Sequence, residues 1–150
     1  MTKEAEGVRV RGLDTIDIES LARIHEKIGG EYNPELWDRR AAHYLRRDPD
    51  AAIVAEIGGN VVGFMLGEVR AGEFGLDETS GWIEVIGVDP DQQGKAVGRH
   101  LADAMVTRFK TRGVQVVRTL VDEKMNDIAS FFTSVGFDPE PMRPFARRLD

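Results

Sequence analysis

The stretch that most constrains the fold of this chain is residues 81–99, GWIEVIGVDPDQQGKAVGR. Residues 82–88 form an apolar run that contains one acid, Glu84, and Pro90 ends the run because proline cannot donate to a sheet ladder. Residues 93–98 then carry two glycines and lead into a helical pattern. A strand, a glycine-rich turn and a helix start together predict an anion-binding site, because the N–H groups of a helix N-terminus attract phosphate.

The residues after this turn predict a parallel strand–helix–strand unit. A helix is expected from Lys95 or Ala96 to about Arg112, and Gly113 ends it. Residues 114–121 are rich in β-branched side chains, which is typical of a strand buried on both faces. Two strands joined by a helix of this length form a right-handed crossover. The buried stripe of the helix is expected at Val97, Leu101, Met105 and Phe109.

The remaining sequence predicts four strands and three helices around this unit. Strands are expected at 8–13, 51–57 and 61–69, with a tight turn at 58–60 between the last two. Asp14 caps one helix, and Asn33 followed by proline opens another that runs through Arg47. A short helix is expected at 126–135, and 137–149 supplies a final strand or pair. The fold class is therefore α/β: one mixed sheet with helices on both faces, in the order β-α-α-β-β-β-α-β-α-β, forming a single domain over residues 1–150.

Composition narrows the class of protein. The chain has 150 residues, 41% hydrophobic and 31% charged, and its formal charge is 20 − 26 = −6. An acidic chain argues against non-specific nucleic-acid binding. It has no cysteine, no apolar run long enough for a membrane span and no apolar signal segment at its start. We therefore expect a cytoplasmic protein that binds neither nucleic acid nor membranes.

The element order and two motifs resemble the GCN5-related N-acetyltransferase (GNAT) superfamily. The first motif is Q-x-x-A-x-G at residues 93–98, directly after a V-D-P at residues 88–90. The second is F-F-T-S-V-G-F at residues 131–137. The resemblance covers the whole chain in element order and is sharpest over residues 82–137. It implies an acetyl-CoA-dependent enzyme that acetylates a primary amine, either on a small cationic molecule or at a protein or peptide N-terminus.

The resemblance also implies where acetyl-CoA binds. Backbone amides of the glycine-rich turn hold the pyrophosphate, with charge added by Lys95 and Arg99. The strand before the turn separates from its parallel neighbour, and its backbone pairs with the pantetheine arm. Gly87 is expected to form a bulge there or, alternatively, to be a packing glycine. Asn126 contacts the arm or caps a helix. The expected coenzyme-binding residues are Ile86, Gly87, Val88, Gln93, Gly94, Lys95, Ala96, Val97, Gly98, Arg99, Asn126 and Phe132.

Direct acetyl transfer requires a base for the amine and a donor for the oxyanion. Glu84 is the predicted base, acting directly or through water. It is the only ionisable side chain in residues 82–88, and burial among apolar neighbours raises a carboxyl pKa toward a useful range. The alternative is a carboxylate satisfied by a neighbouring strand or facing a solvent channel. A backbone N–H near Val88 is the expected oxyanion donor.

Position 132 departs from the family pattern. Many relatives place a tyrosine four residues before the final glycine of the second motif, where it protonates the leaving thiolate. This chain has Phe132, which cannot donate a proton. The only tyrosines, Tyr32 and Tyr44, are candidates to replace it. The substitution leaves open an acyl-CoA-binding sensor or interaction module with little catalysis as the alternative function, and a ligand-free structural domain as a more remote one.

The acceptor amine is expected near the first two helices and the loop before the central strand. Glu31 and Tyr32 are the predicted substrate-binding residues, and the acids at positions 73, 77 and 78 lie in the same segments. Negative charge there favours a cationic amine. The three histidines lack metal-ligand spacing, so no metal site is expected. Relatives often dimerise, which makes a homodimer a possible assembly.

Overall fold

The computed structural model describes residues 7–92 and 94–150. Its contacts divide the chain into two compact units: the first ends at Leu120, and the second is Val121–Asp150. The prediction that residues 1–150 form one domain stays a prediction. Gln93, one of the predicted pyrophosphate residues, lies outside the described residues.

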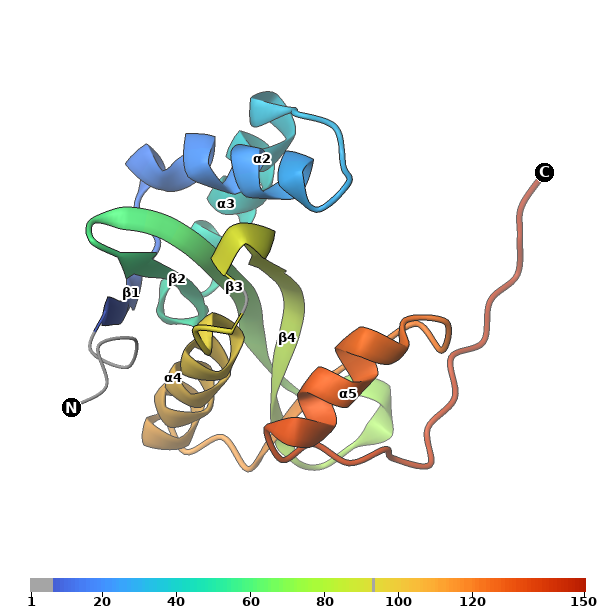
Figure 1. The fold of residues 1–150 in the computed structure, drawn as a ribbon. Helices are drawn as coiled ribbons and strands as arrows, with labels where there is room; N and C mark the ends of the chain where they lie inside the picture. The colour runs from blue at the N-terminus through green and yellow to red at the C-terminus, as the bar shows by residue number, and fades with distance from the viewer. Residues whose placement is uncertain (1–6, 93) are drawn as a thin grey trace. The chain divides into compact units, whose positions relative to one another are not determined.

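The first unit contains a five-stranded mixed sheet in which the strands follow their order in the sequence (Figure 1). Neighbouring strands are antiparallel except the last two, which are parallel. This confirms the strand–helix–strand crossover predicted at its far end. The strands are β1 (Val8–Gly12), β2 (Ala52–Ile57), β3 (Asn60–Ala71), β4 (Thr79–Val88) and β5 (Val116–Thr119).

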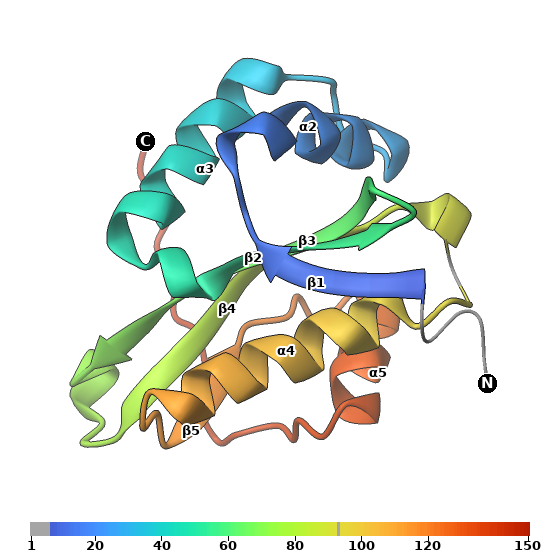
Figure 2. The same cartoon turned by 90° about the vertical axis from the view of Figure 1, so that its left-hand side faces the viewer.

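Helices cover both faces of this sheet, as the sequence predicts (Figure 2). On one face lie α2 (Ile18–Lys27) and α3 (Pro34–Arg47), and on the other lies α4 (Val97–Thr111). Trp37 and Phe64 are each 1% exposed and meet edge to face, with their ring centroids 5.1 Å apart, so both are core residues. Short 3₁₀ turns complete the unit at η1 (Thr15–Asp17), η2 (Pro49–Ala51), η3 (Glu73–Gly75) and η4 (Pro90–Gln92).

Local sequence signals explain where the first helices begin. Asp14 accepts a hydrogen bond from the N–H of Ile16, and Asp17 accepts one from the N–H of Asp14, which together form a capping box before α2. Asn33 caps α3 by accepting from the N–H of Leu36. The Asn33 cap is confirmed, whereas Asp14 caps the 3₁₀ turn η1 that leads into α2, and α2 itself has no side-chain cap. No described helix is long and apolar enough to cross a membrane.

Two predictions about the C-terminal third are wrong. β5 spans four residues rather than 114–121, and Val116 and Val117 are only partly buried, because β5 is the last strand of the sheet and pairs with β4 alone. The second unit contains α5 (Asn126–Ser134), as predicted, but residues 137–149 form no strand. Prolines at positions 139, 141 and 144 lack the N–H that a sheet ladder requires.

Candidate functional site

β4 carries one extra residue where the site begins. In the β3–β4 ladder, Leu66 faces Val85 and Gly67 faces Ile83, so Glu84 has no opposite residue and forms a bulge. The prediction of a bulge at Gly87 is therefore wrong. Gly87 is the packing glycine instead: a Cβ there would lie 2.5 Å from Cζ of Phe64, so only glycine fits under that ring.

Beyond the bulge, one edge of β4 is free in the part of the chain that the structure describes. β5 pairs only with Ser80–Ile83 of β4, and no described strand pairs with the same edge over residues 84–88. Asp89 donates its N–H to the carbonyl of Val62 on β3, at 2.8 Å. Because backbone groups alternate along a strand, the N–H of Val88 faces the free edge. Ile86, Gly87 and Val88 thus lie where an extended ligand can add as a strand.

The start of α4 has the backbone geometry of an anion site. Gly94 has a φ of 86°, and Ala96, the N-cap, is left-handed at 59°, a conformation rare for a residue with a side chain. The N–H groups of Val97 and Gly98 have no acceptor within the helix, and no side chain caps it. Lys95 and Arg99 are exposed beside them. These residues fit the diphosphate of a coenzyme by charge and by donor arrangement.

Glu84 lies beside two side chains that the sequence does not place there. Nη2 of Arg70 donates to Oε2 of Glu84 at 2.5 Å, and Tyr44 is close enough for Glu84 to raise its pKa. The side chain of Glu84 is 27% exposed. The predicted isolation of Glu84 among apolar residues is therefore wrong, because the bulge turns the carboxylate toward β3 and α3. The carboxylate of Glu84 therefore has a partner on a neighbouring strand, as in the alternative interpretation, and it is also accessible to solvent.

Tyr44 is buried at this point and stays protonated. Its burial, the charge of Glu84 and the hydrogen bond to Glu84 raise the pKa of Tyr44 to about 12. A protonated phenol offers an O–H donor to a neighbouring carboxylate at neutral pH. The helical spacing of Trp37, Ala41 and Tyr44, all buried on α3, is the sequence signal that places this tyrosine toward the sheet.

A second carboxylate anchors Arg70. Glu68 accepts from Nη2 of Arg70 at 2.8 Å and from Nε of Arg47 at 2.6 Å. Burial acts to raise the pKa of Glu68, but the hydrogen bonds and charges of Arg47 and Arg70 outweigh it and lower that pKa. Glu68 therefore stays ionised and holds the guanidinium of Arg70 against Glu84. The alternation of β3 places Glu68 and Arg70 on one face, which is the signal in the sequence for this pair.

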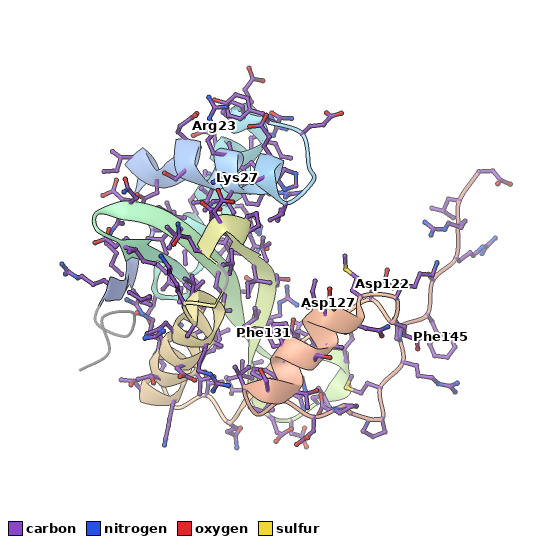
Figure 3. The ribbon with its side chains drawn as sticks, in the orientation of Figure 1. Arg23, Lys27, Asp122, Asp127, Phe131 and Phe145 are labelled. Carbon is purple, nitrogen blue, oxygen red and sulfur yellow. The ribbon has the colours of Figure 1, made fainter. Side chains whose placement is uncertain are left out.

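The predicted acceptor residues lie in the segment between α2 and α3. Tyr32 donates to Oε1 of Glu19 at 2.5 Å, and the guanidinium of Arg23 covers its ring at 4.1 Å (Arg23 is labelled in Figure 3). The hydrogen bond to Glu19 raises the pKa of Tyr32. Glu31 is exposed. Of the acids in the loop before β4, Glu78 pairs with Arg118 at 3.1 Å.

The other two predicted coenzyme residues belong to the second unit. Asn126 is the first residue of α5 and Met125 is the N-cap, so the cap interpretation of Asn126 is wrong. Phe132 is buried, with its ring centroid 5.1 Å from those of both Phe131 and Phe137. The ring packs against Phe131 of α5 and against Phe137, which follows the helix, and it carries no polar atom.

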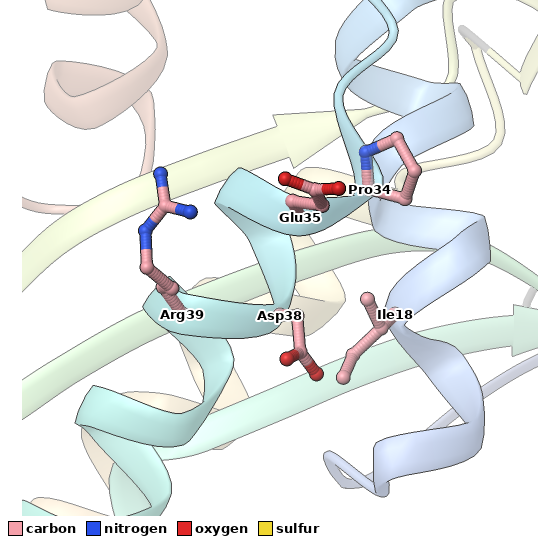
Figure 4. A pocket seen from close by; sticks show the side chains of 5 residues that line it. All are labelled: Ile18, Pro34, Glu35, Asp38 and Arg39. Atoms are coloured by element: carbon pink, nitrogen blue, oxygen red, sulfur yellow. The ribbon is translucent and has the colours of Figure 1, made fainter.

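A shallow hollow elsewhere contains none of the predicted site residues. It lies between the start of α3 and α2 and is lined by both charged and apolar side chains (Figure 4). The lining residues of the hollow are Ile18, Pro34, Glu35, Asp38 and Arg39.

Among residues 7–92 and 94–150, no group of three or more histidines and acids is arranged to hold a metal ion.

Comparison with known proteins supplies relatives in sequence and in fold. Residues 18–137 match the family described as Acetyltransferase (GNAT) family. The mycothiol acetyltransferase of Thermobispora bispora is 36% identical over 139 residues, which cover 88% of this chain and 47% of that protein. This chain thus spans about half the length of that relative.

Solved structures share the fold over most of the chain. Ard1 from Thermoplasma volcanium is 25% identical, with a TM-score of 0.75 over 88% of this chain and 83% of that one. Aminoglycoside N-acetyltransferase AAC(6')-Iy, solved in complex with CoA, is 16% identical, with a TM-score of 0.80 over 94% of each chain. At 16% identity, the second likeness concerns the fold alone.

Proposed function

Because the chain belongs to the acetyltransferase (GNAT) family, we propose that it transfers an acetyl group from acetyl-CoA to a primary amine. The observation that carries this proposal is the free edge of β4 over residues 84–88, followed in the sequence, after η4, by the uncapped N-terminus of α4. Acetyl-CoA joins an extended arm to a diphosphate. The arm matches the free edge of β4, and the diphosphate matches the N-terminus of α4. The relative named mycothiol acetyltransferase supports acyl transfer as the class of reaction.

The binding roles follow from the backbone. Ile86, Gly87 and Val88 pair with the pantetheine arm along the free edge. The N–H groups and positive charges from Gly94 to Arg99 bind the pyrophosphate, and Gln93 joins them as the first residue of the motif. For Asn126 and Phe132, contact with the coenzyme rests on the family resemblance alone.

The chemical roles fall to β4 and α3. Acetyl-CoA supplies the activated acetyl group as a thioester. Glu84 accepts the proton of the attacking amine, directly or through a water, while Arg70 holds its carboxylate in place and Tyr44 lies beside it. The N–H of Val88 faces the free edge and donates to the carbonyl oxygen as negative charge develops there. Since Phe132 has no proton to give, the leaving thiolate takes its proton from water.

The acceptor enters from the side of α2 and α3. We assign Glu31 and Tyr32 to its binding because they lie in the connection between these helices. The helices are close to the base, since Tyr44 of α3 lies beside Glu84. The substrate class is a small amine with positive charge or a protein or peptide N-terminus.

The test is a screen of amines and peptides with acetyl-CoA, detecting free thiol and confirming the product by mass spectrometry. Thiol release that depends on one class of amine supports the proposal. Saturable binding of coenzyme A without thiol release from any acceptor would favour the alternative that Phe132 suggests, an acyl-CoA-binding sensor. Binding of neither coenzyme A nor acetyl-CoA would contradict both.

A further inference from the structure

An ion-pair cluster joins α2 to the turn that follows β4. Nζ of Lys27, in the last turn of α2, lies 3.0 and 2.9 Å from the two carboxylate oxygens of Asp89 and 2.8 Å from Oδ2 of Asp91 (Lys27 is labelled in Figure 3). Asp89 and Asp91 are more than sixty residues away in the sequence. None of these three side chains is part of the site described above.

Asp89 organises the entry to the coenzyme loop. Its N–H donates to Val62 at 2.8 Å, its side chain accepts from the N–H of Asp91 at 2.9 Å, and its carbonyl accepts from the N–H of Gln92 at 2.9 Å. These bonds set the course of η4, which leads to the N-terminus of α4. Burial acts to raise the pKa of Asp89, but Lys27 and the N–H of Asp91 outweigh it and lower that pKa. Asp89 is therefore ionised.

Two carboxylates at the entry to an anion site repel the ligand unless a cation balances them. Lys27 is the cation that contacts both. We propose that Lys27 is a positioning residue for the coenzyme: it fixes η4 through Asp89 and cancels the charge of the two acids in the turn that precedes the start of α4. This inference rests on the proposed function, since it requires the start of α4 to bind that diphosphate.

The test compares Lys27→Met with Lys27→Arg, and uses Lys124→Met as an exposed control in the second unit. Titration calorimetry with coenzyme A is expected to show Kd raised about 5-fold or more in Lys27→Met, restored to within about 2-fold in Lys27→Arg and unchanged in the control. The KM for acetyl-CoA rises in parallel, while kcat at saturation changes less than about 2-fold.

Acetyl-pantetheine, which lacks the diphosphate, separates this role from a general structural one. Lys27→Met should leave kcat/KM for acetyl-pantetheine unchanged, whereas a distorted protein would use both donors less well. Asp91→Asn removes one of the opposing charges and should bind coenzyme A as well as or better than the original chain. Equal coenzyme affinity in Lys27→Met, or equal losses with both donors, would overturn the inference alone. Failure of the original chain to bind coenzyme A would overturn the proposed function and this inference with it.

Discussion

Glu84 owes its position to a single extra residue in β4. Without the bulge, the alternation of the strand would place it differently relative to Trp82 and Val85, and Arg70 would not meet its carboxylate. The sequence identifies Glu84 as the only acid in the run. The sequence does not identify the bulge, because the register of β4 depends on Gly67 of β3. A Cβ added at Gly67 would lie 2.1 Å from the carbonyl oxygen of Trp82.

The role of Glu84 predicts a specific loss in Glu84→Gln. The amide cannot accept the proton of the amine, so kcat should fall by about 10²–10⁴-fold while the Kd for coenzyme A changes little. Steady-state kinetics with the amine found in the screen, together with calorimetry, measure both quantities. Glu123→Gln, an exposed substitution in the second unit, is the control. An unchanged kcat would remove Glu84 as the base.

At the scale of elements, the sequence predicts the strands and helices whose residues carry strong local signals. It does not predict the length or burial of an element where these depend on the elements packed beside it. Asn33-Pro34 fixes the start of α3 because its signals are local. β5 is shorter and less buried than its β-branched composition predicts, since burial depends on what lies beside a strand. Tyr44 on α3 contacts Glu84 on β4, forty residues later in the sequence. The helical spacing of α3 indicates that Tyr44 faces the sheet, but nothing in the sequence indicates that Glu84 is its neighbour.

The packing of β4 against β3 predicts the effect of Gly87→Ala. The new Cβ would lie 2.5 Å from Phe64, which is 1% exposed and has little room to move, so overpacking should lower the free energy of unfolding by about 1–3 kcal/mol. Urea unfolding measures the change. Gly12→Ala is the matched control, because no atom lies within 4 Å of its Cβ position. Equal stability of the two variants would show that β4 does not pack as described.

At the scale of the first unit, ionised carboxylates join helices and turns to the sheet and to each other. Asp17 pairs with Arg11, Glu68 with Arg47 and Arg70, and Asp89 with Lys27. For Asp17, burial acts to raise the pKa, and the hydrogen bonds from Arg11 and the N–H of Asp14 outweigh it and lower that pKa. The same balance lowers the pKa of Glu68 and of Asp89.

These lowered pKa values predict loss of stability in acid. A carboxylate whose folded pKa lies below its unfolded value stabilises the fold fully above the unfolded pKa, and the benefit disappears as pH falls through the folded pKa. The free energy of unfolding should therefore decline as the pH drops below about 5. Asp17→Asn should lower stability at neutral pH and flatten this decline, whereas Asp103→Asn, on the exposed side of α4, should do neither. Urea unfolding between pH 7 and pH 3 is the measurement, and identical pH profiles for Asp17→Asn and the original chain would contradict it.

The central claim is that one ligand occupies the free edge of β4 and the N-terminus of α4 together. The most direct measurement is a titration of the ¹⁵N-labelled protein with coenzyme A, followed by amide chemical shifts. We expect saturable shifts concentrated at residues 86–88 and 94–99, with α4 beyond its first turn and β1 little affected. Saturable shifts that leave both of these ranges unaffected, or no saturable shift at all, would contradict the claim.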